Sequence, residues 1–394
     1  MTAGRLPFIV KGSGKSQGKE TPGWPGPDRR FIVIVLERIE LEGFRSIREM
    51  DLELSDLNIL IGANGSGKSN FASIFALVNQ IAMKNLQVYV GRSGGADALL
   101  HFGRKTTERI YCHLHFVRGG YFFALAPTAS DRMIFTEEEC YYPSPREAEP
   151  VRRRWPKGDK ESRLDEDAHL PVLRMGANLF KLLQPWRVYH FHDTSESAKV
   201  RQTCELHDNK ALRADASNLA SFLYLLREKH QEHYRNIVDA VRMVAPFFDD
   251  FDLSPSRLNE KKIRLEWREK GTDAYFGPEA LSDGTVRFIC LATLLLQPQL
   301  PSLIVIDEPE LGLHPSAIAL AASLLKSAST KTQVIACTQS VTLVNQFEPA
   351  DIVVVDREEG QSVFRRLSEE DVKDWLEDYG LGDLWEKNVL GGRP

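Results

Sequence analysis

The stretch that decides the fold is Gly62-Ala63-Asn64-Gly65-Ser66-Gly67-Lys68-Ser69, which matches the phosphate-binding loop pattern G-x-x-x-x-G-K-[ST] at every fixed position. The mostly apolar run Leu57–Ile61 precedes it and predicts a strand, and residues 70–78 follow it with helical spacing. In this context the glycines let backbone N–H groups surround phosphate oxygens, and the helix N-terminus adds positive charge. A glycine-rich turn that binds nothing is the alternative, and the complete match of motif and flanks disfavours it.

The loop pattern assigns a separate role to each of its conserved side chains. Lys68 is expected to reach the β- and γ-phosphates of a nucleotide, and Ser69 is expected to hold Mg²⁺. The residues expected to contact the nucleotide at this end of the site are Gly62, Asn64, Gly65, Ser66, Gly67, Lys68, Ser69 and Asn70.

The composition is that of an ordinary folded protein, with 394 residues, 42% hydrophobic and 27% charged. This length accommodates two or three domain-sized units, or one large α/β domain with insertions. The net charge of −5 gives no overall attraction to nucleic acid. Five scattered cysteines, without C-x-x-C pairs, predict reduced thiols in a cytoplasmic protein. No apolar run is long enough to span a bilayer, and Leu6–Val10 is too short for the core of a signal peptide.

Composition and periodicity divide the chain into a tail and a head with an insertion. Residues 1–30 are rich in Gly, Pro, Lys and Ser and are predicted to be a disordered tail, which includes the partial phosphate-loop pattern Gly12–Ser16. Residues 31–394 are predicted to form the head, in which a hairpin at Leu41–Ile47 leads into the phosphate-loop strand. Residues 86–260 are predicted to be an inserted lobe. Its strand-like runs are 86–90, 109–117, 121–126 and 132–135, followed by helices near 219–226 and 234–244 and a strand at 247–253. A further strand is predicted at 263–267, just after the lobe.

Three patterns within this predicted lobe allow a second interpretation. Cys112-His113-x-His115 contains metal-ligating residue types, but on a strand Cys112 points away from both histidines and no fourth ligand is evident, so we favour paired strand residues. The basic run Arg152–Lys157 can contact phosphate backbones, but acidic residues follow it and favour a solvated loop of mixed charge. His190 and His192 alternate with aromatic residues at the end of a predicted strand, and two ligands alone indicate a metal site only weakly.

A second set of polar residues lies near the carboxyl-terminal part of the sequence. Leu281-Ser282-Asp283-Gly284-Thr285 precedes a predicted helix at 286–297, so the Ser282 hydroxyl and the Gly284 N–H form a second anion site at a helix start. The apolar run 303–307 predicts a buried parallel strand that ends at Asp307 and Glu308. After a predicted helix at 316–327, a similar strand at 333–337 ends close to Gln339.

Ligands of α/β folds bind at the carboxyl ends of such parallel strands, which suggests roles for these side chains. Asp307 is expected to hold Mg²⁺ through a water molecule. Glu308 is placed to polarise the water that attacks the γ-phosphate, and Gln339 to sense that phosphate. Towards the end of the chain, Ser368 is predicted to cap a short packing helix at Glu369–Leu376.

The order and spacing of these motifs resemble the ABC-type ATPase heads of the RecF/SMC/OLD class, and the hairpin at Leu41–Ile47 strengthens the resemblance. It extends from about residue 35 to residue 394. Two further stretches, Tyr189–Thr194 and Leu384–Pro394, are similar to a small bacterial group of stand-alone ATPases in that class. The motifs that carry the resemblance are Gly62–Ser69, Leu281–Thr285, Ile306–Glu310 and Thr338–Ser340.

The resemblance implies an α/β P-loop NTPase fold with a mainly parallel sheet, an antiparallel edge sheet and an inserted mixed lobe. It also implies ATP and Mg²⁺ as cofactors and an ATP-dependent homodimer. In that dimer Ser282 and Gly284 of one subunit would contact the γ-phosphate bound by Lys68 of the other.

The sequence departs from the pattern of the related transporters in three places. Asp283 and Thr285 stand where transporters usually have Gly and Gln, and Gln339 stands where they have a histidine. No glutamine of the Q-loop type is recognised. Its place is open to three residues at the end of one predicted strand, namely His190, His192 and Asp193.

Three functions are compatible with these patterns to different degrees. An ATP-hydrolysing, dimerising switch that acts with DNA or a DNA-processing partner, in repair or phage defence, fits them best. A nucleotide-binding subunit of a membrane transporter is the alternative, but Gln339, the inserted strands and the lack of a membrane-coupling motif disfavour it. A nuclease of the OLD type would need a further domain, and the 54 residues after Ser340 are too few for one.

Overall fold

The computed structural model describes residues 35–143, 149–164, 166, 174–375 and 378–392. Backbone contacts separate residues 1–33 from a second unit at residues 34–394, and only the second unit is considered below. The predicted tail at residues 1–30 lies outside the described residues. Within the described part of the chain, no helix is long and apolar enough to cross a membrane.

The central sheet has six strands in the order β17-β16-β3-β15-β14-β8, and all neighbours pair in parallel except β16 and β17. The strands β3, β14 and β15 are buried along their whole length, as their continuous apolar sequences predict. The prediction of a mainly parallel sheet is therefore confirmed. The strands are β3 (Leu57–Ile61), β8 (Arg187–Tyr189), β14 (Leu303–Asp307), β15 (Gln333–Thr338), β16 (Ile352–Glu358) and β17 (Gln361–Arg366).

The second sheet is antiparallel throughout, in the order β2-β1-β4-β5-β6-β7. The predicted hairpin is confirmed as β1 and β2, and the strands predicted at 109–117, 121–126 and 132–135 are β4, β5 and β6. These strands extend the hairpin directly. The bounds are β1 (Leu36–Phe44), β2 (Ile47–Glu53), β4 (Ile110–Phe116), β5 (Gly119–Pro127), β6 (Met133–Tyr142) and β7 (Val151–Arg154).

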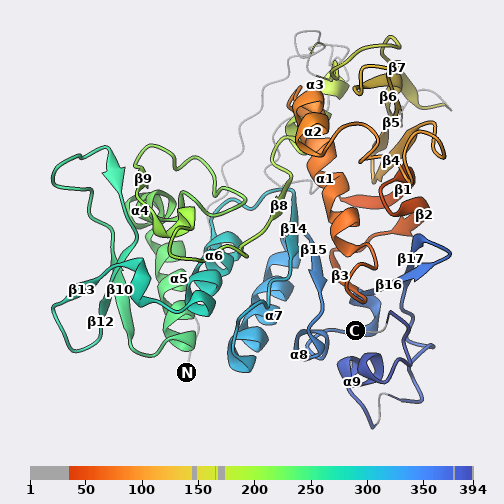
Figure 1. The fold of residues 1–394 in the computed structure, drawn as a ribbon. Helices are drawn as coiled ribbons and strands as arrows, with labels where there is room; N and C mark the ends of the chain where they lie inside the picture. Colours follow the sequence, from red (N-terminus) through yellow and green to blue (C-terminus); the bar gives the residue numbers. More distant parts are fainter. Residues whose placement is uncertain (1–34, 144–148, 165, 167–173, 376–377, 393–394) are drawn as a thin grey trace, which may run out of the picture. The chain divides into compact units, whose positions relative to one another are not determined.

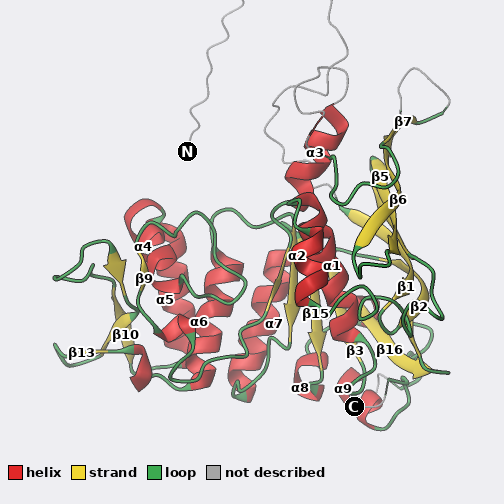
Figure 2. Cartoon of the chain, turned by 45° about the horizontal axis from the view of Figure 1, so that its top comes forward, coloured by secondary structure: helices red, strands yellow, loops and turns green. Residues whose placement is uncertain are grey.

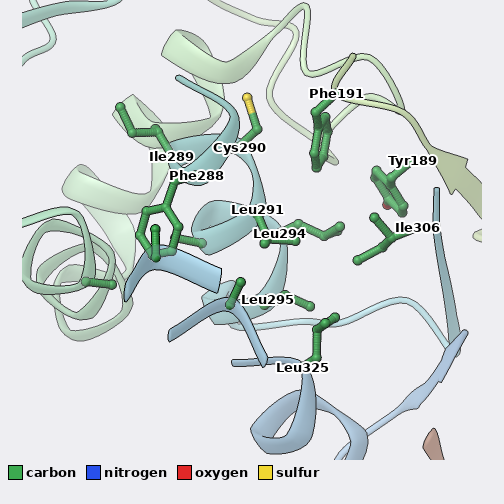
Figure 3. Packing of buried hydrophobic residues seen from close by; sticks show 14 of the residues in the cluster. Tyr189, Phe191, Phe288, Ile289, Cys290, Leu291, Leu294, Leu295, Ile306 and Leu325 are labelled. Atoms are coloured by element: carbon green, nitrogen blue, oxygen red, sulfur yellow. The ribbon is translucent and has the colours of Figure 1, made fainter. Parts of the chain in front are cut away.

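Helix α1 (Lys68–Ala82) lies between the two sheets (Figures 1 and 2). Its buried residues, including Phe71 and Phe75, share one apolar cluster with the inner face of the antiparallel sheet and with Val305 and Ile335 of the central sheet. The opposite face of the central sheet is covered by α6 (Asp283–Leu296) and α7 (Pro315–Ser329). Figure 3 shows this second cluster, in which side chains of α6 lie beside Tyr189 of β8, Ile306 of β14 and Leu325 of α7.

The remaining elements surround this layered core. The predicted helices at 219–226 and 234–244 are confirmed as α4 and α5, and the predicted strands at 247–253 and 263–267 fall on two small sheets, β10-β12-β13 and β11-β9. The bounds are α3 (Arg174–Leu183), β9 (Cys204–Glu205), α4 (Leu219–Lys229), α5 (Gln231–Val244), β10 (Phe248–Asp252), β11 (Lys262–Ile263), β12 (Glu266–Glu269), β13 (Tyr275–Phe276), α8 (Val341–Val344) and α9 (Leu381–Glu386).

The segment predicted as an inserted lobe, residues 86–260, contributes strands to several sheets. Strands β4 to β7 continue the β1–β2 hairpin, and β8 joins the central sheet. Its status as a domain of its own stays a prediction. All five cysteines are free thiols, as predicted.

Residues 86–90, predicted as a strand, belong instead to helix α2 (Leu86–Arg92). The reason lies far away in the sequence, because the carboxylate of Glu161 accepts hydrogen bonds from the N–H groups of Leu86 (2.8 Å) and Gln87 (3.1 Å). This carboxylate satisfies two free donors at the helix start. Leu86 and Val90 are then buried on one face of the helix.

Two other local predictions are wrong. Residues 151–154, predicted as a solvated loop, form β7, in which Arg152 (2.5 Å) and Arg154 both pair with Glu139, a side chain only 1% exposed. Residues 369–375 form turns instead of the predicted helix, and residues 376–377 lie outside the described part. Ser368 and Asp371 hold the start of these turns by two reciprocal hydrogen bonds.

Gln333 joins the two large sheets at the first position of β15, where it is 1% exposed. Its side chain donates to the carbonyls of Leu36 (2.8 Å) and Ser55 (3.0 Å) and accepts from the Leu36 N–H (3.2 Å). We predict that Gln333→Leu lowers the free energy of unfolding by about 3 kcal/mol, because it deprives the buried N–H and carbonyl of Leu36 of this partner and removes one of the two side-chain hydrogen bonds to the Ser55 carbonyl. Urea unfolding measures the change. Gln299→Leu, at an exposed position, is the control and should change stability by no more than about 0.5 kcal/mol.

Candidate functional site

The carboxyl ends of β3, β15 and β14 meet at one edge of the central sheet, because these strands are parallel neighbours. The loop at residues 62–67 follows β3, Glu308 follows β14, and Gln339 follows β15. Side chains from three separate parts of the sequence are thus placed together, which is the arrangement expected from the motifs.

Lys68, the first residue of α1, lies against the glycine-rich loop and is only 5% exposed. Its ammonium group donates to the carbonyls of Gly62 (2.6 Å) and Ala63 (2.9 Å). Burial lowers the pKa of Lys68, and the nearby carboxylates oppose that shift in part. The buried hydroxyl of Ser66 has no hydrogen-bond partner among the described residues, so this loop retains an unused polar group.

The hydroxyl of Ser69 donates to a carboxylate oxygen of Asp307 at 3.0 Å. Asp307 is only 7% exposed, and Nδ1 of His190 lies 3.8 Å from the same carboxylate oxygen. Burial lowers the pKa of His190. A serine hydroxyl beside a carboxylate, close to a phosphate-binding loop, is a donor set that suits Mg²⁺, so the residues present fit this ion.

Glu308 is held by neighbours on two sides. Its carboxylate accepts a hydrogen bond from Nε2 of Gln339 (2.6 Å), and its other oxygen lies 3.9 Å from Nε2 of His192. The backbone of Glu308 has a φ of 49°, a strained left-handed conformation for this residue type, and its N–H is fixed by the carbonyl of Cys337 (2.8 Å). Such strain is typical of functional positions and here turns Glu308 away from the strand direction.

Glu310 has a role that the sequence did not reveal. Its carboxylate accepts hydrogen bonds from the Thr338 hydroxyl (2.6 Å) and the Gln339 N–H (3.1 Å) and therefore fixes the segment that carries Gln339. Burial raises the pKa of Glu310. A second unpredicted feature is His192, whose Nε2 also lies 3.0 Å from the Asp307 carbonyl oxygen. The sequence placed His190 and His192 at a strand end but could not show which carboxylates they face.

A cavity of about 460 Å³ lies beside the phosphate loop. Asn70 borders it and donates to the Ser46 hydroxyl at 2.7 Å, and Ser362 donates to the Ser66 carbonyl at 2.6 Å. Arg45, in the turn between β1 and β2, lines this cavity. Its polar and aromatic lining includes Arg45, Ser46, Asn70, His101, Phe102 and Arg357.

Ser282 and Gly284, predicted to form a second anion site, lie at the N-terminus of α6. Ser282 is the exposed N-cap residue, and its hydroxyl accepts from the Thr285 N–H at 3.1 Å. The buried guanidinium of Arg201 donates to Asp283 (2.7 Å) and to the carbonyls of Pro278 and Leu281, so it anchors the loop before the helix. Within the described residues, no hydrogen bond joins Ser282 or Gly284 to the residues around Lys68.

Helix α6 is nevertheless tied to the catalytic edge of the sheet. Arg287 donates to the carbonyls of Phe191 (3.2 Å) and His192 (2.8 Å). Gly284 packs so closely against the carbonyl oxygen of Gly312 that a Cβ atom would overlap it. The segment after Glu308 and the start of α6 are therefore in direct contact.

Two family models match this sequence. A model described as "AAA ATPase domain" matches residues 35–239, just over half of the chain. The chain belongs to this family. A second model, described as "AAA domain, putative AbiEii toxin, Type IV TA system", matches residues 152–345 of this AAA ATPase. Together they identify an ATP-hydrolysing enzyme, and the part of the chain from β1 to α8 falls within their matches.

Solved structures agree with this assignment at the level of the fold. An SMC head bound to the C-terminal winged-helix domain of ScpA is 16% identical and covers 86% of this chain and 99% of its own, with a TM-score of 0.58. An SMC head with an extended coiled coil, derived from Pyrococcus furiosus, is 16% identical and covers 87% and 98%, with a TM-score of 0.52. No curated protein sequence matches the chain. The AAA ATPase therefore has the fold of an ABC-type head of the RecF/SMC class.

The close contact at Gly284 generates a prediction for the AAA ATPase. Gly284→Ala should lower ATP turnover at least about tenfold, since the added methyl group forces α6 away from the segment that follows Glu308, while ATP binding to the monomer stays unchanged. Steady-state phosphate release and equilibrium nucleotide binding measure the two effects. Gly91→Ala, in α2 with open space around the position, is the control and should behave like wild type. Normal turnover of Gly284→Ala would show that this contact is not needed for catalysis.

Proposed function

We propose that this chain is an ATP-driven dimerising switch that acts with DNA or a DNA-processing partner. The observation that carries the proposal is the division of polar groups into two sets. Lys68, Asp307, Glu308 and Gln339 surround one edge of the sheet, whereas Ser282 lies exposed on α6 without hydrogen bonds to them. A second copy of the chain would bring the missing anion site to the bound nucleotide.

The proposed chemistry follows from the positions of the side chains. Lys68 and the backbone N–H groups of the loop hold the phosphates, and the cavity beside Asn70 takes the rest of the nucleotide. Ser69 and Asp307 would hold Mg²⁺, which neutralises developing phosphate charge when bound. Glu308 accepts a proton from the attacking water.

Two further side chains position Glu308. Gln339 donates to one of its oxygens, and His192 lies near the other. In this proposal His192 helps to hold the carboxylate in place, whereas Gln339 both holds the carboxylate and senses the γ-phosphate.

The proposed dimer depends on the attraction of the α6 N-terminus for an anion. This 14-residue helix begins at an exposed serine cap, so its free N–H groups and dipole attract an anion. Ser282 and Gly284 would contact the γ-phosphate held by the partner copy. Arg287 and Gly284 connect α6 to the segment around Glu308. Binding of α6 to the partner's nucleotide would therefore change the position of Glu308.

The comparisons also bear on the partner and the biological role of the switch. One related head is described as bound to a domain of ScpA, and one matching family is described as a toxin of a type IV TA system. These descriptions favour a partner protein and a defence role over a repair role. Arg152 and Arg154 are engaged by Glu139, so this basic run is a poor choice for a DNA contact. We place the switch in the cytoplasm.

Glu308→Gln tests the proposal at its hydrolytic step. The variant should bind ATP normally, hydrolyse it at least about 100-fold more slowly and accumulate as an ATP-bound dimer, since the amide cannot accept a proton from water. Phosphate release and mass photometry with and without ATP and Mg²⁺ are the measurements. The matched control is Glu386→Gln, at an exposed position of α9.

Each outcome of this experiment has a clear meaning. A slow variant that dimerises with ATP supports the switch. A variant that turns over ATP like wild type assigns the general base to another residue. A slow variant that stays monomeric at all ATP concentrations contradicts the dimer. Stimulation of the wild-type rate by double-stranded or single-stranded DNA, measured in parallel, decides whether nucleic acid is the effector.

A further inference from the structure

Three metal-ligating side chains gather on the outward face of the antiparallel sheet. Glu40 of β1 is directly opposite His113 of β4, and His115 is two residues further along the same face. One ligand atom from each of the three lies within 4.8 Å of the other two. The closest pair is Nε2 of His115 and Oε1 of Glu40, at 2.8 Å.

The sequence pointed to the two histidines but not to their partner. Cys112 points into the core and is fully buried, as expected for a residue one position before His113 on a strand. Burial raises the pKa of its thiol, so it contributes nothing to this face. Glu40 comes from the neighbouring strand, more than seventy residues earlier in the chain, and only the strand register reveals it.

Tyr141 of β6 offers a fourth group to the same cluster. Its hydroxyl lies 3.1 Å from Nε2 of His113 and 3.4 Å from Nδ1 of His115. Gly120 of β5 makes this reach possible, because a Cβ atom there would lie 2.6 Å from the Tyr141 hydroxyl oxygen. The Tyr141 side chain of β6 can therefore reach across β5 to the two histidines of β4.

The surroundings allow a cation despite a nearby arginine. Arg38 lies 3.2 Å from Glu40, but both of its main hydrogen bonds, each 2.5 Å, run to Asp51, so Arg38 stays paired if Glu40 turns to an ion. The side chains of Glu40 and His115 are 29% and 25% exposed, which lets an ion enter and still excludes part of the bulk water.

We propose that Glu40, His113 and His115 bind a divalent transition-metal ion, for which zinc is the best match, with the Tyr141 hydroxyl or a water as fourth ligand. Two imidazoles and one carboxylate are a common zinc donor set, and softer thiolate ligands are not involved. The ion would join β1 to β4 and reach towards β6, so its expected role is to stabilise this sheet.

This site is distinct from the nucleotide site. Glu40 lies on β1 four residues before Phe44, where the strand ends, which is about 13 Å along the strand, and Ser46, which borders the phosphate-loop cavity, lies in the turn beyond it. Zinc binding here is therefore independent of the proposed ATP switch, and either idea can fail without the other.

The test is a zinc titration of the purified full chain after removal of metals with a chelator. The Asp307→Asn background is used throughout, because it removes the proposed Mg²⁺ site as a competing ion site. We expect one equivalent of zinc, measured by competition with a colorimetric chelator, and Co²⁺ absorption bands typical of a four-coordinate site. Glu40→Gln and His113→Ala should each weaken binding at least about tenfold, whereas His207→Ala, at an exposed position, should have no effect.

Thermal unfolding provides the second measurement. Zinc should raise the Tm of the parent chain and leave that of Glu40→Gln unchanged, since a ligand that binds only the folded state stabilises it. Glu40→Gln is nearly isosteric, so it remains informative if a histidine variant fails to fold. Absence of stoichiometric zinc in the parent chain, or undiminished zinc binding by Glu40→Gln, would overturn the proposal and leave a hydrogen-bonded cluster without metal.

Discussion

The hydrogen bond between Ser69 and Asp307 is the contact on which the rest of the site depends. It joins residues 238 positions apart, one at the start of the helix after β3 and one at the end of β14. Parallel pairing through β15, which lies between these two strands, is what makes the contact possible. A slip of register in either pairing would separate the phosphate loop from the carboxylates, so the buried apolar strands specify the chemistry as much as the polar residues do.

In the proposed switch, contacts at the same edge of the sheet would couple the second anion site to the first. The carbonyls of Phe191 and His192, which follow β8, accept hydrogen bonds from Arg287 of α6. Arg201 holds the loop before this helix, and the contact between Gly284 and Gly312 closes the connection on the other side. In the proposed switch, a ligand that binds at the start of α6 would act on the segment that contains Glu308 through these contacts.

Local patterns in the sequence were sufficient for much of the fold and for the composition of the site. Continuous apolar runs predicted β3, β14 and β15, and the turn residues predicted the β1–β2 hairpin, because burial and turn chemistry are local properties. Features that depend on distant partners were missed. The segment at Leu86 became a helix because Glu161 caps it, and the basic run at Arg152 became a strand because Glu139 pairs with it. The role of Glu310 and the place of Glu40 beside His113 depend on strand register, which no local pattern shows.

Whether one nucleotide site is built from two subunits is tested most directly by mixing two inactive variants. Lys68→Ala removes the phosphate-loop half of the site, and Ser282→Arg removes the α6 half. Each variant alone should hydrolyse no ATP, whereas their mixture should regain turnover, because a heterodimer keeps one site with an intact Lys68 from one chain and an intact Ser282 from the other. A mixture that stays inactive although mixed dimers form, or Ser282→Arg protein that hydrolyses ATP at the wild-type rate by itself, would contradict a shared site.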